Sequence, residues 1–64
     1  MKLWNILAVI GGDTRIIIYG GHKELFNGKM CEASKTEWDT KVGEYMNNEV
    51  IRVNTKDGVI TIAV

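Results

Sequence analysis

The single histidine and the single cysteine of the chain are the residues that could form a nucleophilic pair. An imidazole beside a thiol favours the reactive thiolate, and His22 and Cys31 are close in the sequence. A small buried cysteine and a solvated loop histidine are far commoner, however. Carboxylates such as Glu44 and Glu49 show no spacing that indicates acid–base catalysis. We therefore expect a protein that is not an enzyme.

The glycine-rich segment IYGGHKELFNGK, residues 18–29, raises the question of a phosphate-binding loop. A P-loop needs the pattern GxxxxGK[ST] before a helix, and a dinucleotide loop needs GxGxxG. Neither pattern occurs, and HKELF is typical of a strand that returns to pair with RIIIY. We interpret Gly20-Gly21 as the reversal between two strands. Asn27-Gly28 is interpreted as a bulge or bend in the returning strand, in preference to the tip of the hairpin.

Aromatic and cationic side chains next to polar segments are the best candidates for a binding face. Aromatic rings stack on planar ligands, and arginine or lysine neutralises an anion. We expect Trp4 and Phe26, by contrast, to fill the core. The candidate ligand- or partner-binding residues are Arg15, Tyr19, His22, Lys23, Trp38, Tyr45 and Arg52. Either they hold a small anionic, nucleotide-type ligand, or they are solvated strand residues with ordinary ion pairs.

The chain is short for a domain that must bury a core. A 64-residue chain buries only about 60 % of its unfolded surface, and small cores barely offset conformational entropy without disulfides, metals or oligomerisation. One cysteine excludes an intrachain disulfide, and the scattered Asp13, Asp39 and Asp57 lack the spacing of a calcium loop. We expect a single domain over residues 1–64 that binds no metal or cofactor and forms a homo-oligomer.

Charge and hydropathy restrict the class of partner. The eight basic and eight acidic residues alternate along the chain, which disfavours non-specific nucleic-acid binding, although folding could still assemble a local basic patch. The apolar residues 3–10 are too few to span a bilayer and lack a signal-peptide cleavage site. We expect no membrane contact and a cytoplasmic location, which the unpaired cysteine also favours.

Residues 3–10 predict a short helix. Their apolar side chains recur at spacings of three and four, and Gly11-Gly12 supplies a C-cap. A strand is the alternative, because Val9 and Ile10 favour extended backbone. Residues 14–19, TRIIIY, predict a strand with apolar side chains on both faces. Such a strand is expected to be central in its sheet or covered by another subunit.

The middle of the chain predicts a returning strand over residues 23–31 and a short helix over residues 35–39. Ser34 and Glu37 have the spacing of a capping box, in which each side chain bonds a backbone N–H at the start of a helix.

The last third predicts strands. One is expected around residues 41–46, and Asp57-Gly58 predicts the turn of a hairpin between EVIRVN and GVITIAV. The fold expected is α+β and mostly β: a short N-terminal helix packed on a strongly bent antiparallel sheet, or a small partly open barrel, of four to five strands.

LWNILAVI, DTRIIIY, ELFNGK and VIRVNTKDGVITIAV together span most of the chain. With them the chain resembles small β-rich proteins of bacteriophages and mobile elements of Gram-positive bacteria. The resemblance carries over no binding residue. It implies a protein of the host cytoplasm that sequesters or inhibits a host defence component, either a host protein or a nucleotide-type signal. The alternative is a structural or assembly component of a larger particle.

Overall fold

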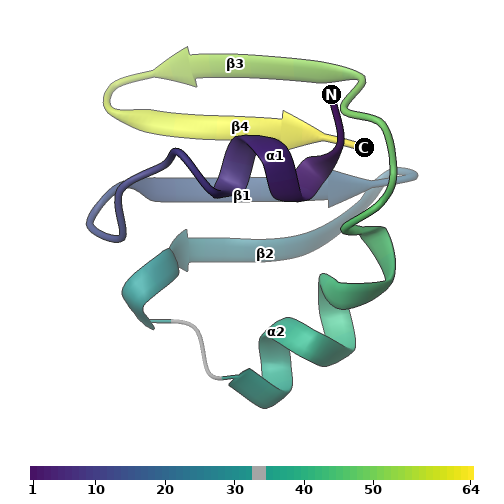
Figure 1. The fold of residues 1–64 in the computed structure, drawn as a ribbon. Helices are drawn as coiled ribbons and strands as arrows, with labels where there is room; N and C mark the ends of the chain where they lie inside the picture. The colour runs from purple at the N-terminus through teal and green to yellow at the C-terminus, as the bar shows by residue number, and fades with distance from the viewer. Residues whose placement is uncertain (33–34) are drawn as a thin grey trace.

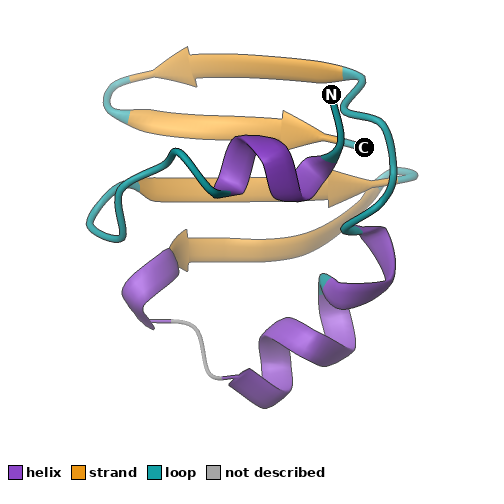
Figure 2. Cartoon of the chain, in the orientation of Figure 1, coloured by secondary structure: helices purple, strands orange, loops and turns teal. Residues whose placement is uncertain are grey.

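The computed structural model describes residues 1–32 and 35–64. The strands are β1 (Arg15–Gly20), β2 (Lys23–Lys29), β3 (Arg52–Lys56) and β4 (Val59–Ala63). The helical segments are α1 (Leu3–Leu7), α2 (Lys35–Lys41) and the 3-10 helices η1 (Met30–Glu32) and η2 (Gly43–Tyr45). Helix α1 lies across one face of the sheet, and α2 lies beside the β2 edge (Figures 1 and 2).

The four-stranded sheet is mixed, with the strand order β2-β1-β4-β3. The hairpins β1–β2 and β3–β4 are antiparallel, but β1 runs parallel to β4, with Ile16 opposite Ile60 and Ile18 opposite Ile62. The predicted fold class, mostly β with a short helix and a four- to five-stranded sheet, is confirmed. The strongly bent antiparallel sheet or partly open barrel is not, because the sheet is open and its central pair is parallel. Parallel neighbours need a long crossover, which residues 30–51 provide by carrying the chain from one sheet edge to the other. The prediction that residues 14–19 form a central strand is confirmed for β1.

The core lies between α1 and the sheet and continues toward α2. Its buried members are Leu3, Leu7, Ile16, Ile18, Leu25, Phe26, Val42 and Ile62. The four-residue spacing of Leu3 and Leu7 puts both on one side of α1, and the two-residue spacing of Ile16 and Ile18 puts both on one face of β1. Each element thus contributes its periodic apolar face to one shared interior.

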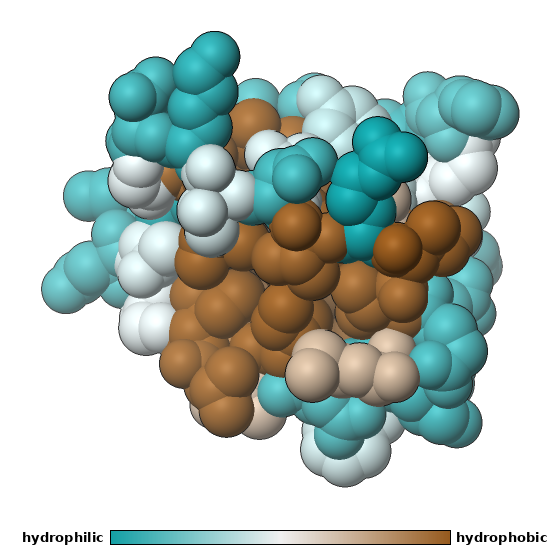
Figure 3. All heavy atoms as spheres, turned by 90° about the horizontal axis from the view of Figure 1, so that it is seen from above, coloured by the Kyte–Doolittle hydropathy of each residue, from teal (hydrophilic) through white to brown (hydrophobic). Residues whose placement is uncertain are grey.

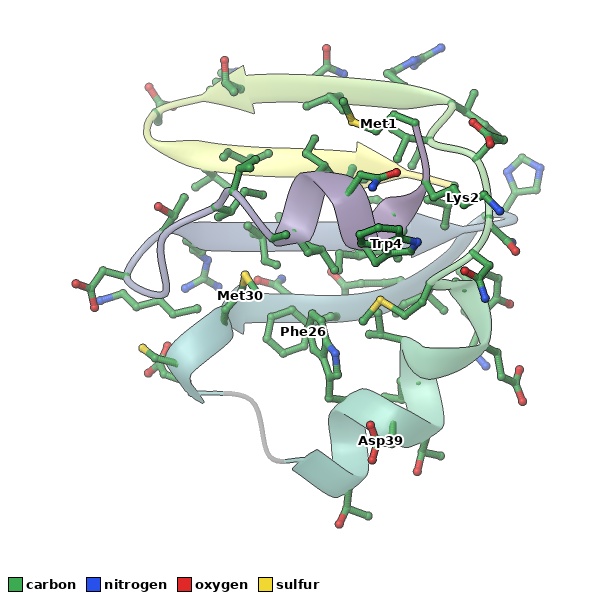
Figure 4. The ribbon with its side chains drawn as sticks, viewed as in Figure 1. Met1, Lys2, Trp4, Phe26, Met30 and Asp39 are labelled. Carbon is green, nitrogen blue, oxygen red and sulfur yellow. The ribbon has the colours of Figure 1, made fainter. Side chains whose placement is uncertain are left out.

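Of the two aromatic residues predicted for the core, Phe26 is buried and Trp4 is not. The ring of Phe26 meets that of Trp38 edge-on with the centroids 5.2 Å apart. Trp4 is 50 % exposed on α1, so its placement in the core is wrong. Figure 4 shows Trp4 in front of α1 and Phe26 between β2 and α2. Leu3 and Leu7 already occupy the inner side of the short helix, which leaves the indole outside.

The helices differ in length from the prediction. The α-helical part of residues 3–10 ends at Leu7, and tighter turns follow in which Val9 N–H donates to Ile6 O and Ile10 N–H to Leu7 O. The strand predicted over residues 41–46 is wrong: α2 continues to Lys41 and η2 follows it. Burial of Val42 in the core holds this segment in helical turns. The predicted Ser34–Glu37 capping box lies outside the described residues.

The turns correct two further predictions. The first hairpin reverses at Gly21 and His22, with φ of 55° and 75°, one residue later than predicted, because Gly20 is the last residue of β1. The irregularity in the β1–β2 pairing lies between Ile18 and Tyr19, where Leu25 of β2 has no opposite residue. A bulge at Asn27-Gly28 is therefore wrong. The Asp57-Gly58 turn is confirmed, with φ of 53° and 77°.

Candidate functional site

The predicted binding residues do not converge on one place. Tyr19, His22 and Arg52 line a groove at one end of the sheet. Lys23 and Tyr45 line a second depression, between β2 and the α2–η2 segment. Arg15 and Trp38 line neither of these two hollows. A single anion pocket built from all of these side chains is therefore absent from the described part of the chain.

The groove at the end of the sheet is a shallow hollow of about 640 Å³, open to solvent. Its floor includes the small side chains of Thr61 and Ala63 on β4. Tyr19 on β1 and Arg52 on β3 are both opposite Ala63, so they stand on either side of it. The strand ends are tied together by backbone bonds of 2.8 Å from Val64 N–H to Tyr19 O and from Ile51 N–H to Ala63 O. The hollow therefore has an aromatic wall and a cationic wall on a firmly paired backbone.

The groove is one end of a larger surface, the sheet face opposite α1, which we call the open face. Strand register places its residues in three rows of cross-strand neighbours: Lys29, Arg15, Val59 and Lys56; Asn27, Ile17, Thr61 and Asn54; and Glu24, Tyr19, Ala63 and Arg52. None of these residues is buried. No described element covers this face.

Hydrogen bonds on the open face fix the side chains of β2 against β1. Arg15 Nη2 donates to Asn27 Oδ1 at 2.8 Å, and Asn27 Nδ2 donates to Glu24 Oε1 at 3.2 Å. The amide thus links a cation in the first row to a carboxylate in the third. Arg15, which was predicted as a site residue, belongs to this face although it does not line the groove.

The second depression is smaller, about 380 Å³, and carries charges of both signs. Lys23 and Lys41 line it together with Glu24 and Glu44, so it offers no excess of either charge. Tyr45 is half-buried here, and its ring closes over Gly20. Tyr45 and Trp38 therefore take part in packing, and the binding role predicted for them stays a prediction.

The residues considered for catalysis are far apart. His22 lies in the turn before β2, whereas Cys31 lies in η1, beyond the other end of the same strand. Cys31 is a free, exposed thiol. Within residues 1–32 and 35–64, no three side chains of His, Cys, Asp or Glu gather in a way that could hold a metal ion.

An exposed apolar surface lies along the β3 edge and was missed by sequence reasoning. We define it by Ile51 and Val53 of the β3 segment and by Met1 and Val9, which flank α1; these side chains are 76 %, 42 %, 69 % and 81 % exposed. Viewed from the β3 edge, hydrophobic atoms form a broad continuous area on the α1 side of the molecule (Figure 3). Helix α1 crosses β1 and β4 but leaves β3 uncovered, and β3 pairs on one side only. The alternation of Ile51 and Val53 was visible in the sequence, but the edge position of their strand was not.

The N-terminus is held beside this surface. The Met1 ammonium forms a 2.9 Å ion pair with Glu49 Oε2, and Val50 N–H donates to Met1 O at 2.8 Å. The hydrogen bond from the ammonium and its positive charge lower the pKa of Glu49 below its usual value. Both groups are exposed, so the contact positions the chain end more than it stabilises the fold.

Among the described residues, no helix has the length and apolar character needed to cross a membrane. No protein-family model matches the chain, and neither the curated proteins nor the solved structures contain a significant match to it.

Proposed function

We propose that the protein is a non-catalytic binding module that self-associates and acts by holding a partner molecule. The observation that carries this proposal is the apolar surface of Met1, Val9, Ile51 and Val53 beside the free edge of β3. Exposed apolar area of this kind, rimmed by polar residues, is typical of a protein contact site.

Self-association would remove two unfavourable features of the isolated chain, its exposed apolar area and its unpaired strand edge. Burial of apolar area contributes roughly 25 cal/mol per Å² removed from water, and these side chains are left in water by the isolated chain. An unpaired strand edge also invites pairing with another chain. The occupant proposed for this surface is a second copy of the chain, because the small core leaves little stability to the monomer.

Sequestration or inhibition of a host component is the role we propose for the assembled module, in line with the resemblance to phage and mobile-element proteins. The groove at Tyr19, His22 and Arg52 supports a partner with negative charge. An assembly component of a larger particle is the alternative, and it would use the same apolar surface without needing the groove.

Sedimentation analysis over a wide concentration range tests the proposal. We expect the wild-type chain, 7.2 kDa as a monomer, to sediment at a multiple of that mass. Val9 and Ile51 are the most exposed of the four apolar residues, so the double variant V9K/I51K should fold and shift the protein toward the monomer.

Thr36→Lys is the matched control, because it adds a lysine to an exposed position of α2, beyond the opposite edge of the sheet. This variant should associate as the wild type does. A wild type that stays monomeric throughout, or a V9K/I51K variant as large as the wild type, would contradict self-association through this surface.

A further inference from the structure

Basic and acidic residues alternate along the sequence, but the fold places mainly basic side chains on the open face. The open face carries Arg15, Lys29, Arg52 and Lys56 but only one acidic side chain, Glu24. Glu24 is at a corner of the face and already accepts a hydrogen bond from Asn27. The neighbouring carboxylates of Asp13, Glu32 and Asp57 lie beyond the strand ends rather than on the face, although Glu32 Oε1 accepts a hydrogen bond from Lys29 N–H at 3.3 Å. A chain with no net charge thus presents a locally basic surface.

The middle of the open face is uncharged. Ile17, Thr61 and the amides of Asn27 and Asn54 form its central row. Tyr19 presents an aromatic ring at the wall of the groove, with 37 % of its surface exposed. The arrangement offers a ring for stacking, the Asn54 amide and the Thr61 hydroxyl for hydrogen bonds, and cations at the margins. The Asn27 amide is already bonded to Arg15 and Glu24.

We propose that the open face binds a short single-stranded nucleic acid. Charge complementarity selects a polyanion, and the exposed ring beside Ala63 gives one base a stacking position. Arg52 lies across the groove from that ring and contacts the backbone there, while Lys56, Arg15 and Lys29 contact it at the far end of the face. The inference names the partner class for the binding module proposed above.

The span of the basic side chains favours an oligonucleotide over a mononucleotide. Three interstrand steps separate Lys29 from Lys56, or about 14 Å, and four residues of β3 separate Arg52 from Lys56, or about 13 Å. A mononucleotide in the groove would leave the first row unused. A duplex presents its bases inside a stack, where Tyr19 cannot reach a ring face. An acidic peptide would meet the cations but has no base for the tyrosine.

Fluorescence anisotropy with a labelled single-stranded oligonucleotide of about ten nucleotides tests this inference. We expect saturable binding that weakens as salt rises, with a log–log slope of about −0.7 for each phosphate contacted. Tyr19→Leu should weaken binding about tenfold or more, and Tyr19→Phe, which keeps the ring, should bind as the wild type does. Circular dichroism and urea midpoints show whether each variant is folded.

Two lysines give a matched pair for the electrostatic part. Lys56→Gln removes a charge from the open face and should reduce the salt slope by about 0.7. Lys2→Gln removes the same charge next to α1, on the opposite side of the sheet, and should leave the slope unchanged. If the two substitutions change the salt slope equally, the oligonucleotide is attracted to the protein as a whole and not to the open face. That result would overturn the inference.

Competition experiments distinguish a single-stranded oligonucleotide from other anionic ligands of the open face. Unlabelled oligonucleotide should displace the probe far better than a mononucleotide, a duplex or poly-glutamate at equal charge concentration. Equal displacement by any of these three, or no binding at low salt, would overturn the inference. Sedimentation of Tyr19→Leu and Lys56→Gln reads self-association separately, so loss of one property is distinguished from loss of the other. The V9K/I51K variant does not serve this purpose, because Ile51 also lines the groove.

Discussion

At the scale of single residues, close packing around the small core limits which side chains fit. Gly20 is the sharpest case: a Cβ placed there would lie 2.8 Å from Leu25 Cδ1 and 2.8 Å from Tyr45 Cε1. The tyrosine ring therefore packs directly on the end of β1, and only a hydrogen fits between them.

We expect Gly20→Ala to lower the free energy of unfolding by about 1–3 kcal/mol, because an added methyl group overfills the contact. Urea denaturation measures the change. Gly43→Ala is the control, because its Cβ would find no atom nearer than 4.0 Å, and it should be neutral or slightly stabilising. If Gly20→Ala unfolds at the same urea concentration as the wild type, the side chains of Leu25 and Tyr45 can move aside without loss of stability.

The Glu49 carboxylate gives the fold a small dependence on acid pH. Its pKa is lowered in the folded chain by the Met1 ammonium, so the ion pair contributes stability above the usual carboxyl pKa of 4.5. That contribution is lost as pH falls through the lower, folded-state pKa. We expect the difference in melting temperature between wild type and Glu49→Gln, both with a free amino terminus, to shrink as the solution is acidified below about pH 4.5.

A difference that stays constant from neutral to strongly acidic pH would rule out this ion pair as its source. Acetylation of the amino terminus provides the control, because it removes the ammonium and should remove most of the difference; the smaller attraction from Lys2 remains.

At the scale of elements, the sequence was informative wherever one local rule governs the backbone. The β3–β4 hairpin follows from an Asp-Gly turn between alternating strands, and β1 follows from three consecutive isoleucines. The strand predicted over residues 41–46 is helical instead, and its Val42 is buried in a core that is built mostly by segments distant in the sequence. Local pattern carries no information about such burial.

The candidate site was predictable in its residue types but not in its grouping. The sequence predicted the candidate side chains as members of one binding face, and the structure brings Tyr19, His22 and Arg52 of that set to one groove. Lys23, Trp38 and Tyr45 lie elsewhere because α2 and η2 occupy the β2 side of the sheet. Which candidates share a surface depends on strand order, and the order β2-β1-β4-β3 follows from the crossover rather than from any motif.

The turn of the second hairpin offers a test at this scale. Gly58 has φ of 77°, and a Cβ added there would meet no atom within 4 Å, so Gly58→Ala adds backbone strain without a clash. We expect a loss of about 1–2 kcal/mol in the free energy of unfolding. Asp57→Asn should leave stability unchanged, because asparagine also tolerates positive φ. Equal urea midpoints for wild type and Gly58→Ala would contradict the strain.

At the scale of the whole molecule, the face of the sheet under α1 contributes buried side chains to the core, whereas no residue of the open face is buried. Ile18 on the α1 side is fully buried, whereas the adjacent Ile17 on the open face is only partly covered. The residues proposed to bind a partner and the residues that build the core therefore alternate along β1.

Substitution of the two isoleucines measures this division. Ile18→Val should cost about 0.5–1.5 kcal/mol, because it leaves a cavity in the core. Ile17→Val should cost clearly less, since its site is partly solvated. Thermal and urea unfolding of the two variants give the comparison, and equal losses would mean that the open face is covered in the folded protein.

The parallel pairing of β1 with β4 also sets the order of events in folding. Neither hairpin is stable by itself, because two strands without a covered face are marginal in water. The sheet is complete only when residues 15–20 pair with residues 59–63. This pairing closes a long loop, which includes β2, α2, η2 and β3. Without β4, the β1 strand would have no partner on one side, and Ile16 and Ile18 would lack the cover that Ile62 gives them in the core.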